Sequence, residues 1–258
     1  MLAAALPVAA TPPTGATPQR VVSLNLCSDE LALSLAAPGQ LVGVSRLGAD
    51  PDETSLAARA SGLSINRGRV TDVIGLAPDL VLTSGGDPNA AATARRLGIA
   101  ALEVPEPRSL ADVRANIRRV AAALGRAPAG EALIAEMATQ LGTPETHPTA
   151  ALLVGGGGLT ISPHGLAAAY LRQAGLVQQD VPRGQISLER LLSNPPQLLV
   201  ISNYRSAQYS GNQNWLAHPA LAHLPASTRR IETDGRAWTC LGPPLAAEIA
   251  RLRGRVHP

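Results

Sequence analysis

Lysine and phenylalanine are absent from this 258-residue chain, and cysteine, tryptophan and tyrosine are scarce. All 22 basic residues are arginines, and they are scattered along the sequence rather than gathered into a stripe. With a net charge of only +3, the chain lacks the concentrated basic patch that a nucleic-acid surface needs. We therefore expect no nucleic-acid partner.

The lack of lysine also bears on the glycine-rich run VGGGGLTISPHG at residues 154–165. This run has neither the Lys-Ser/Thr pair of a P-loop nor the last glycine of the G-x-G-x-x-G pattern, which argues against phosphate binding. Its glycines either let a bulky ligand approach the backbone or form a tight turn.

Long apolar runs are missing as well. After the N-terminal 20 residues, no segment reaches the roughly 18 consecutive apolar residues that a membrane-spanning helix needs. The N-terminal MLAAALPVAATPPTGATPQR combines an apolar run with the small residues at which a secretory leader ends, although a basic start is lacking. No lipobox-like cysteine follows the apolar run, so we expect no lipid anchor. We expect a soluble, exported protein; a disordered tail at 1–19 is the alternative.

Short aliphatic strand patterns alternate with helical patterns along most of the chain. Arg20–Leu26 is a predicted strand, and Ser28–Ala37 is a predicted helix with Ser28 as its N-cap. Between the two alternating regions, Ser109–Leu141 has one long helical pattern, in which Ala127–Pro128 predicts a kink or a break. The alternation predicts an α/β fold of two lobes with mainly parallel sheets, joined by one long backbone helix, with the ligand cleft between the lobes. We expect a tail at 1–19, an N-terminal lobe at 20–108, the connecting helix at 109–142 and a C-terminal lobe at 143–258.

Four segments carry a family resemblance: RVVSLNLCSDELALSLA, VTDVIGLAPDLVLTSGG, LEVPEPRSLADVRANIRRVAAALGR and ISLERLLSNPPQLLVIS. In their order and spacing the chain resembles the helical-backbone (class III) periplasmic substrate-binding proteins of ABC importers, of the cobalamin and ferric-siderophore type. The resemblance implies a periplasmic, monomeric binding protein that delivers a metal chelate to an inner-membrane ABC permease, without catalysis and without a cofactor. It also implies docking through an acidic residue on each lobe, for which Asp87 and, more distantly, Glu189 are candidates.

In open parallel sheets, ligands bind outside the carboxyl ends of the strands, which selects the loops after the predicted strands. The candidate ligand-binding residues on these loops are Asn25, Cys27, Arg46, Arg67, Ser84, Tyr204, Arg205, Arg236 and Trp238. Tyr204 and Trp238 either stack on a flat ligand or pack beneath the loops. The four arginines suit carboxylate or catecholate groups, and a solvated rim is the alternative for each of them.

The two cysteines, Cys27 and Cys240, fall on loops predicted for opposite lobes. Three interpretations stay open: a disulfide, a pair of thiolates that hold a soft metal, or two small buried apolar side chains. Export favours the disulfide. It would cross-link the lobes and restrict their opening.

Two alternative functions remain. A zinc or manganese receptor of the same architecture needs several converging His and carboxylate ligands, whereas only His164 among five histidines falls on a predicted cleft loop. A cysteine-dependent enzyme with Cys27 as nucleophile and His164 as base lacks a nucleophile motif. Among chelates, few aromatics argue against a stacked corrinoid, and the arginines favour an anionic siderophore. Heme has only His164 or Tyr204 as a candidate axial ligand.

Overall fold

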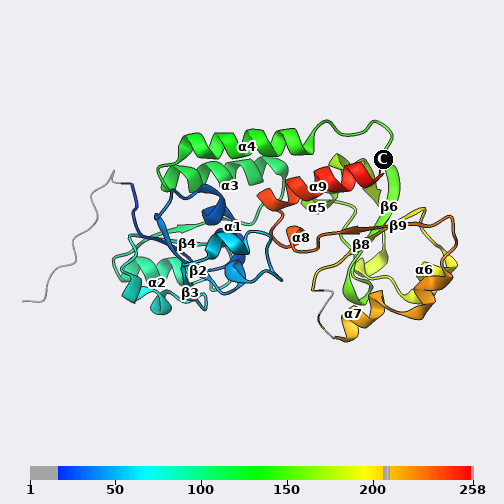
Figure 1. Ribbon diagram of the computed structural model, residues 1–258, viewed down its shortest axis with the longest axis horizontal. Coiled ribbons are helices and arrows are strands. Elements are labelled where there is room, and N and C mark those ends of the chain that lie inside the picture. The colour runs from blue at the N-terminus through cyan, green and yellow to red at the C-terminus, as the bar shows by residue number, and fades with distance from the viewer. Residues whose placement is uncertain (1–16, 206–207, 209, 257–258) are drawn as a thin grey trace, which may run out of the picture.

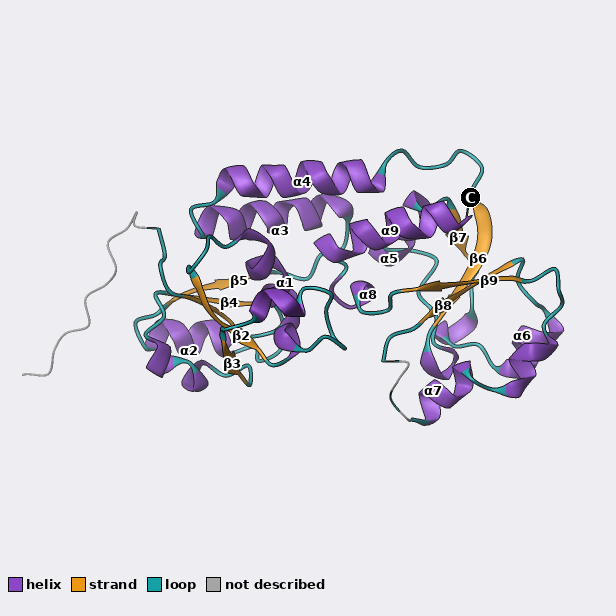
Figure 2. Ribbon diagram, viewed as in Figure 1, coloured by secondary structure: helices purple, strands orange, loops and turns teal. Residues whose placement is uncertain are grey.

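The computed structural model describes residues 17–205, 208 and 210–256, and these residues form two α/β lobes that lie side by side (Figure 1). Each lobe contains one parallel sheet flanked by helices (Figure 2). Within the described ranges, no helix is both long enough and apolar enough to cross a membrane.

The first lobe contains a five-stranded parallel sheet with the strand order β3-β2-β1-β4-β5. Its elements are β1 (Val21–Ser23), α1 (Leu26–Leu35), β2 (Leu41–Ser45), β3 (Ser64–Asn66), β4 (Leu80–Thr83), α2 (Ala90–Arg96) and β5 (Ala100–Glu103). The two central strands, VVS in β1 and LVLT in β4, are buried along their whole length. Continuous apolar strands of this kind are typical of a sheet that is covered on both faces.

The second lobe contains a four-stranded parallel sheet with the order β7-β6-β8-β9. Its elements are β6 (Thr149–Val154), α5 (Leu166–Gln173), β7 (Leu176–Gln178), α6 (Leu188–Ser193), β8 (Leu198–Ser202), α7 (Gly211–Leu216), β9 (Arg229–Thr233), α8 (Ala237–Cys240) and α9 (Pro243–Val256). The short edge strands β7 and β9 were not predicted from the sequence, because β7 has only three residues and β9 is mostly polar and exposed.

Helix α1 begins earlier than predicted. Its N-cap is Asn25, whose Oδ1 accepts a hydrogen bond from the backbone N–H of Ser28 at 3.2 Å. The prediction of Ser28 as the N-cap is therefore wrong. Leu26 is buried and draws the first turn toward the core, so Ser28 lies inside the helix and bonds to Ser23 and to Asn25.

The connection between the lobes consists of two packed helices, α3 (Leu110–Ala123) and α4 (Ala127–Leu141). Gly125, with φ +68°, follows the end of α3 in the left-handed conformation that glycine adopts without strain. Pro128 then stands in the first turn of α4, where its missing N–H has no intrahelical partner to lose. The expected break at Ala127–Pro128 is present, and the connection is not one continuous helix.

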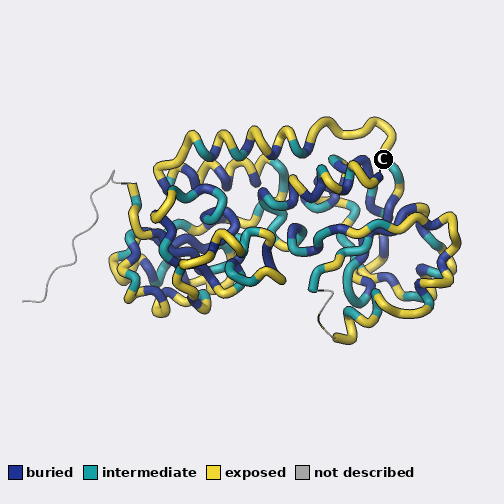
Figure 3. The backbone as a smooth tube through the Cα atoms, viewed as in Figure 1, coloured by how far each residue is buried: buried dark blue, intermediate teal, exposed yellow. Residues whose placement is uncertain are grey.

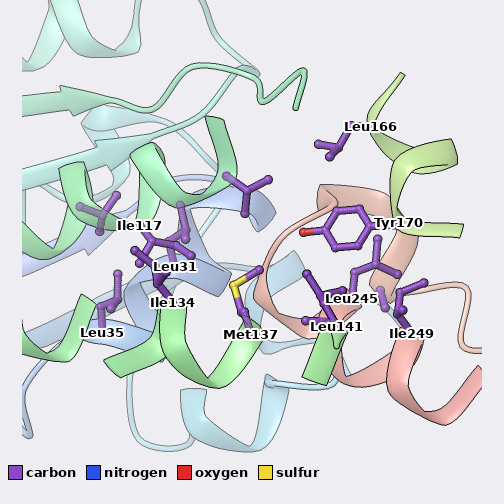
Figure 4. Close-up of a cluster of buried hydrophobic side chains, with 14 of the residues drawn as sticks. Leu31, Leu35, Ile117, Ile134, Met137, Leu141, Leu166, Tyr170, Leu245 and Ile249 are labelled. Carbon is purple, nitrogen blue, oxygen red and sulfur yellow. The ribbon is translucent and has the colours of Figure 1, made fainter. Parts of the chain in front are cut away.

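One apolar core extends across the junction of the lobes. It draws side chains from α1, from both connecting helices, and from α5 and α9 of the second lobe: Leu31, Leu35, Ile117, Ile134, Met137, Leu141, Leu166, Tyr170, Leu245 and Ile249 (Figure 4). Figure 3 shows that the opposite faces of α3 and α4 are exposed. Because separating the lobes here would expose apolar surface, the shared core opposes wide hinge motion.

A single guanidinium ties three helices together at the second-lobe end of this junction. Arg253 of α9 donates to the carbonyl oxygens of Gln140 and Leu141 at the end of α4, and to that of Gln173 at the end of α5. A positive charge at a helix C-terminus complements the partial negative charge of the unpaired carbonyls. Arg253 therefore stabilises the position of α9 relative to both neighbours.

Candidate functional site

The carboxyl ends of the two sheets face each other across the junction. Strand order reverses between β1 and β4 in the first lobe and between β6 and β8 in the second. Parallel sheets bind ligands at such reversals, outside the carboxyl ends of the strands. Figure 2 shows the short helix α8, which follows β9, between the two lobes. The loops after β1 and β9 therefore approach each other at the junction.

The structure contains the disulfide between Cys27 and Cys240, with a Cα–Cα distance of 5.2 Å. Cys27 lies in the first turn of α1 and Cys240 is the last residue of α8, so the bond joins the loop regions after β1 and β9. Both cysteines line a small hollow of about 30 Å³ together with Ser84. The disulfide removes the thiol on which the alternative of a cysteine nucleophile depends.

A second set of contacts crosses the junction around Glu53. The Tyr204 hydroxyl donates to Oε2 of this buried first-lobe carboxylate at 2.7 Å, and Arg205 forms an ion pair with it. The guanidinium of Arg205 also lies over the Tyr204 ring, 5.6 Å from the ring centre. Burial and the Asp50 carboxylate raise the pKa of the Tyr204 phenol, so the hydroxyl keeps the proton that it donates.

Arg236 makes a further contact between the lobes. Its Nη1 donates to the carbonyl oxygen of Pro51 in the first lobe at 2.6 Å. Its other nitrogens donate to both carboxylate oxygens of Asp234, at 2.9 and 2.7 Å. These hydrogen bonds lower the pKa of Asp234, which stays ionised and holds the guanidinium in place.

A polar hollow of about 320 Å³ opens beside these contacts, between the 50–54 turn and the second lobe. Four arginines and three acids line it: Arg205, Arg236, Arg251, Arg255, Asp52, Glu232 and Asp234. Three of these arginines already form ion pairs: Arg205 with Glu53, Arg236 with Asp234 and Arg251 with Glu248. Of the predicted ligand-binding residues, Arg205 and Arg236 meet here, with Tyr204 at the margin.

Other predicted residues lie on the first-lobe side of the junction. Arg46 and Arg67 follow the neighbouring strands β2 and β3, and both are exposed. Asn25 is half-buried, and its amide donates to the backbone oxygen of Ser84. The Asn25 side chain thus joins the loops after β1 and β4, on either side of the strand-order reversal.

Trp238 is half-buried and packs against the central core. Its indole N–H donates to Oγ1 of Thr233 at the end of β9, at 2.9 Å. The ring therefore packs beneath a loop of the junction, which is one of the two alternatives, and stacking on a ligand stays a prediction.

The glycine run after β6 packs against its own lobe. Gly158 has φ +76°, and a Cβ at this position would overlap the carbonyl oxygen of Ile186 and touch the Trp215 ring. A side chain is therefore excluded by neighbouring backbone, which favours the tight-turn interpretation of this glycine. His164, further along, is exposed.

Two acids of α1 are buried in the first lobe, and the sequence did not predict their burial. Asp29 accepts hydrogen bonds from the backbone N–H of Ser45 at 3.1 Å and from its hydroxyl at 2.5 Å, yet burial raises the pKa of Asp29. Burial also raises the pKa of Glu30 to about 7, against the opposing hydrogen bond from the Thr54 hydroxyl. In the sequence both residues read as ordinary acids of a helix's first turn.

Glu53 was not predicted either. It stands in the segment DPDET, which has the composition of a solvated turn, and its partners are about 150 residues away in the sequence. Among the described residues, no group of three or more His, Cys, Asp or Glu side chains converges as a metal site would require.

The chain matches a protein-family model, described as periplasmic binding protein, over residues 21–234. No match is found among curated protein sequences. Among solved structures, a periplasmic heme-binding protein from Pseudomonas aeruginosa is similar, with 22% identity, 93% of each chain covered and a TM-score of 0.70.

Two further structures extend the comparison. The periplasmic heme-binding protein BhuT, in complex with two hemes, is 25% identical, with 93% of this chain and 98% of that chain covered and a TM-score of 0.70. The periplasmic vitamin B12-binding protein BtuF of Vibrio cholerae is 18% identical, with 92% and 96% covered and a TM-score of 0.61. With a family match over most of its length and this two-lobe architecture, the chain belongs to the periplasmic binding protein family and has the class III fold.

Proposed function

We propose that this protein is a periplasmic solute-binding protein that receives a metal chelate between its lobes and delivers it to an inner-membrane ABC permease. One observation carries the proposal: the loops after β1 and β2 of the first sheet and after β8 and β9 of the second meet at a junction already tied by the Cys27–Cys240 disulfide. This arrangement needs only ligand binding, and no side chain is assigned a catalytic role. The N-terminal segment, which fits a secretory leader, supports export, and we propose that the mature protein is a monomer.

The ligand is proposed as a chelate that carries anionic groups. Similar structures bind heme and vitamin B12, and the arginines at the junction favour a ligand with carboxylate or catecholate groups, such as a ferric siderophore. Arg46 and Arg67 would meet the ligand from the first lobe, and Arg205 and Arg236 from the second. Asn25 and Ser84 would line the first-lobe wall, where Cys27 contributes its half of the disulfide.

The test is a titration of the purified, oxidised protein with cobalamin, ferric siderophores, heme and simple metal ions, followed by tryptophan fluorescence. The chain contains only two tryptophans, Trp215 and Trp238. In the Trp215→Phe variant, Trp238 is the sole reporter, and in Trp238→Phe only the tryptophan beside Gly158 remains. We expect one chelate to quench Trp215→Phe at micromolar concentration or below, with a much smaller change in Trp238→Phe.

Two results would contradict the proposal. Quenching by a bare ion alone would favour a metal-ion receptor. If no chelate gives a response in fluorescence or calorimetry, metal chelates are excluded as the ligand. A matched pair of variants then locates the site. Arg46→Gln with Arg67→Gln should weaken an anionic chelate about tenfold, whereas Arg118→Gln, on the exposed face of the connecting helices, should not.

A further inference from the structure

A turn at residues 50–54, here called the 50–54 loop, projects from the first lobe toward the second. The Asp50 side chain accepts the N–H of Asp52 at 2.9 Å, and the Asp50 backbone oxygen accepts the N–H groups of Glu53 and Thr54 at 3.0 and 3.1 Å. The aspartate thus closes a local turn of a kind that Asp and Pro favour. Thr54 anchors the loop inward, because its hydroxyl donates to the buried Glu30.

The turn presents Glu53 to the second lobe. Glu53 is only 2% exposed, and the partners of its carboxylate are the Tyr204 hydroxyl and the Arg205 guanidinium. A buried carboxylate needs such partners, because an unpaired one pays the full desolvation penalty. The second lobe therefore completes a site that the first lobe leaves unsatisfied.

The second lobe is built to receive this carboxylate. Arg205 has φ +51°, a left-handed conformation that is unfavourable for a residue with a side chain. The neighbouring Tyr204 carbonyl accepts the Gln213 side-chain amide at 2.8 Å. Gly235 lies so close to Tyr204 that a Cβ at position 235 would overlap it. These contacts support the backbone around 204–205 in a conformation that directs both side chains at Glu53.

We propose that Glu53 is a positioning residue of the ligand cleft: it holds Tyr204 and Arg205 against the first lobe and forms a reversible latch between the lobes, separate from the disulfide. The latch consists of a hydrogen bond and an ion pair that can break and re-form, whereas the disulfide is covalent. In its effect on the ligand, the inference rests on the proposed function, because Tyr204 and Arg205 are proposed to meet the chelate.

The latch is tested without any ligand, by hydrogen exchange on the full oxidised protein. Glu53→Gln should raise the exchange of backbone amides at 203–205 about tenfold, in a lobe that does not contain the mutation. Reciprocally, Tyr204→Phe and Arg205→Met should raise exchange in the 50–54 loop. Glu131→Gln, which removes the exposed ion pair with Arg118 on the connecting helices, is the matched control and should change neither loop.

Reciprocity distinguishes a latch from a merely local role. If Glu53→Gln raises exchange only within 50–54, or changes neither loop, the proposal is wrong. If Glu53→Gln fails to fold, the two second-lobe variants decide the question from the other side. Dissociation of the chelate found by titration should also be about tenfold faster in Glu53→Gln. If no chelate binds even the unmodified protein, the proposed function fails while the exchange result still decides the latch.

Discussion

Replacing both cysteines with alanine tests how strongly the disulfide holds the fold together. Cys27 and Cys240 are 213 residues apart in the sequence, so the bond closes a very long loop in the unfolded chain. In the chain-entropy description, a loop of that length corresponds to about 5 kcal/mol of stabilisation, and residual structure in the unfolded state reduces this toward about 3 kcal/mol. We expect Cys27→Ala with Cys240→Ala to lower the free energy of unfolding by that amount.

The assay is urea denaturation followed by far-UV circular dichroism, with unfolding free energies from linear extrapolation. The reduced unmodified protein is the control, because the chain has no other cysteines, and it should match the double variant. Because one apolar core spans both lobes, the transition should remain single in each case. A loss below about 1 kcal/mol would refute the reasoning that the bond acts by restricting the unfolded chain. Two separated transitions would refute the shared core.

Three further changes probe the groups around the junction. The pKa of Glu30 is about 7 in the fold against an ordinary 4.5, so the free energy of unfolding falls by about 3 kcal/mol as the pH rises through this window. Glu30→Gln, which keeps a hydrogen bond to Thr54, should remove most of that pH dependence in urea titrations at pH 5 and pH 8. An unchanged difference between the two pH values would contradict the assignment. Gly158→Ala should lower the free energy of unfolding by more than about 2 kcal/mol, because its Cβ meets the Ile186 carbonyl oxygen, and a neutral effect would mean that this turn adapts. Arg253→Lys should lower the melting temperature by several degrees, because a single ammonium cannot replace the fork that joins the ends of α4 and α5; equal melting temperatures would argue against this bridge.

The order of strands and helices was predictable wherever the hydrophobic pattern agreed with the proline and glycine residues that mark turns and helix ends. The buried aliphatic run at Leu80–Thr83 follows a proline turn and forms β4, and the helical pattern at Leu166–Gln173 follows a glycine and forms α5. Boundaries were lost where two signals competed. Asn25 and Ser28 are both good N-caps, and the burial of Leu26 decided between them.

In the candidate site, too, the residues that a local sequence signal marks were predictable, and those that depend on distant partners were not. Cys27 and Cys240 were predictable as a pair, because an exported chain with only two cysteines has one possible bond. Glu53 was not, because its burial depends on a tyrosine and an arginine of the other lobe, which no local pattern reveals. Likewise, the raised pKa of Glu30 follows from packing between α1 and the 50–54 loop, and not from its position in a helix's first turn.

The central claim is that a metal chelate binds between the two lobes and contacts both of them. Anomalous X-ray diffraction at the absorption edge of the metal, from crystals of the chelate-bound protein, places that metal directly. The account predicts one anomalous peak between the loops after β1 to β3 and those after β8 and β9, within reach of arginines from both lobes. A peak on the outer surface of a single lobe, or beside the connecting helices, would contradict it.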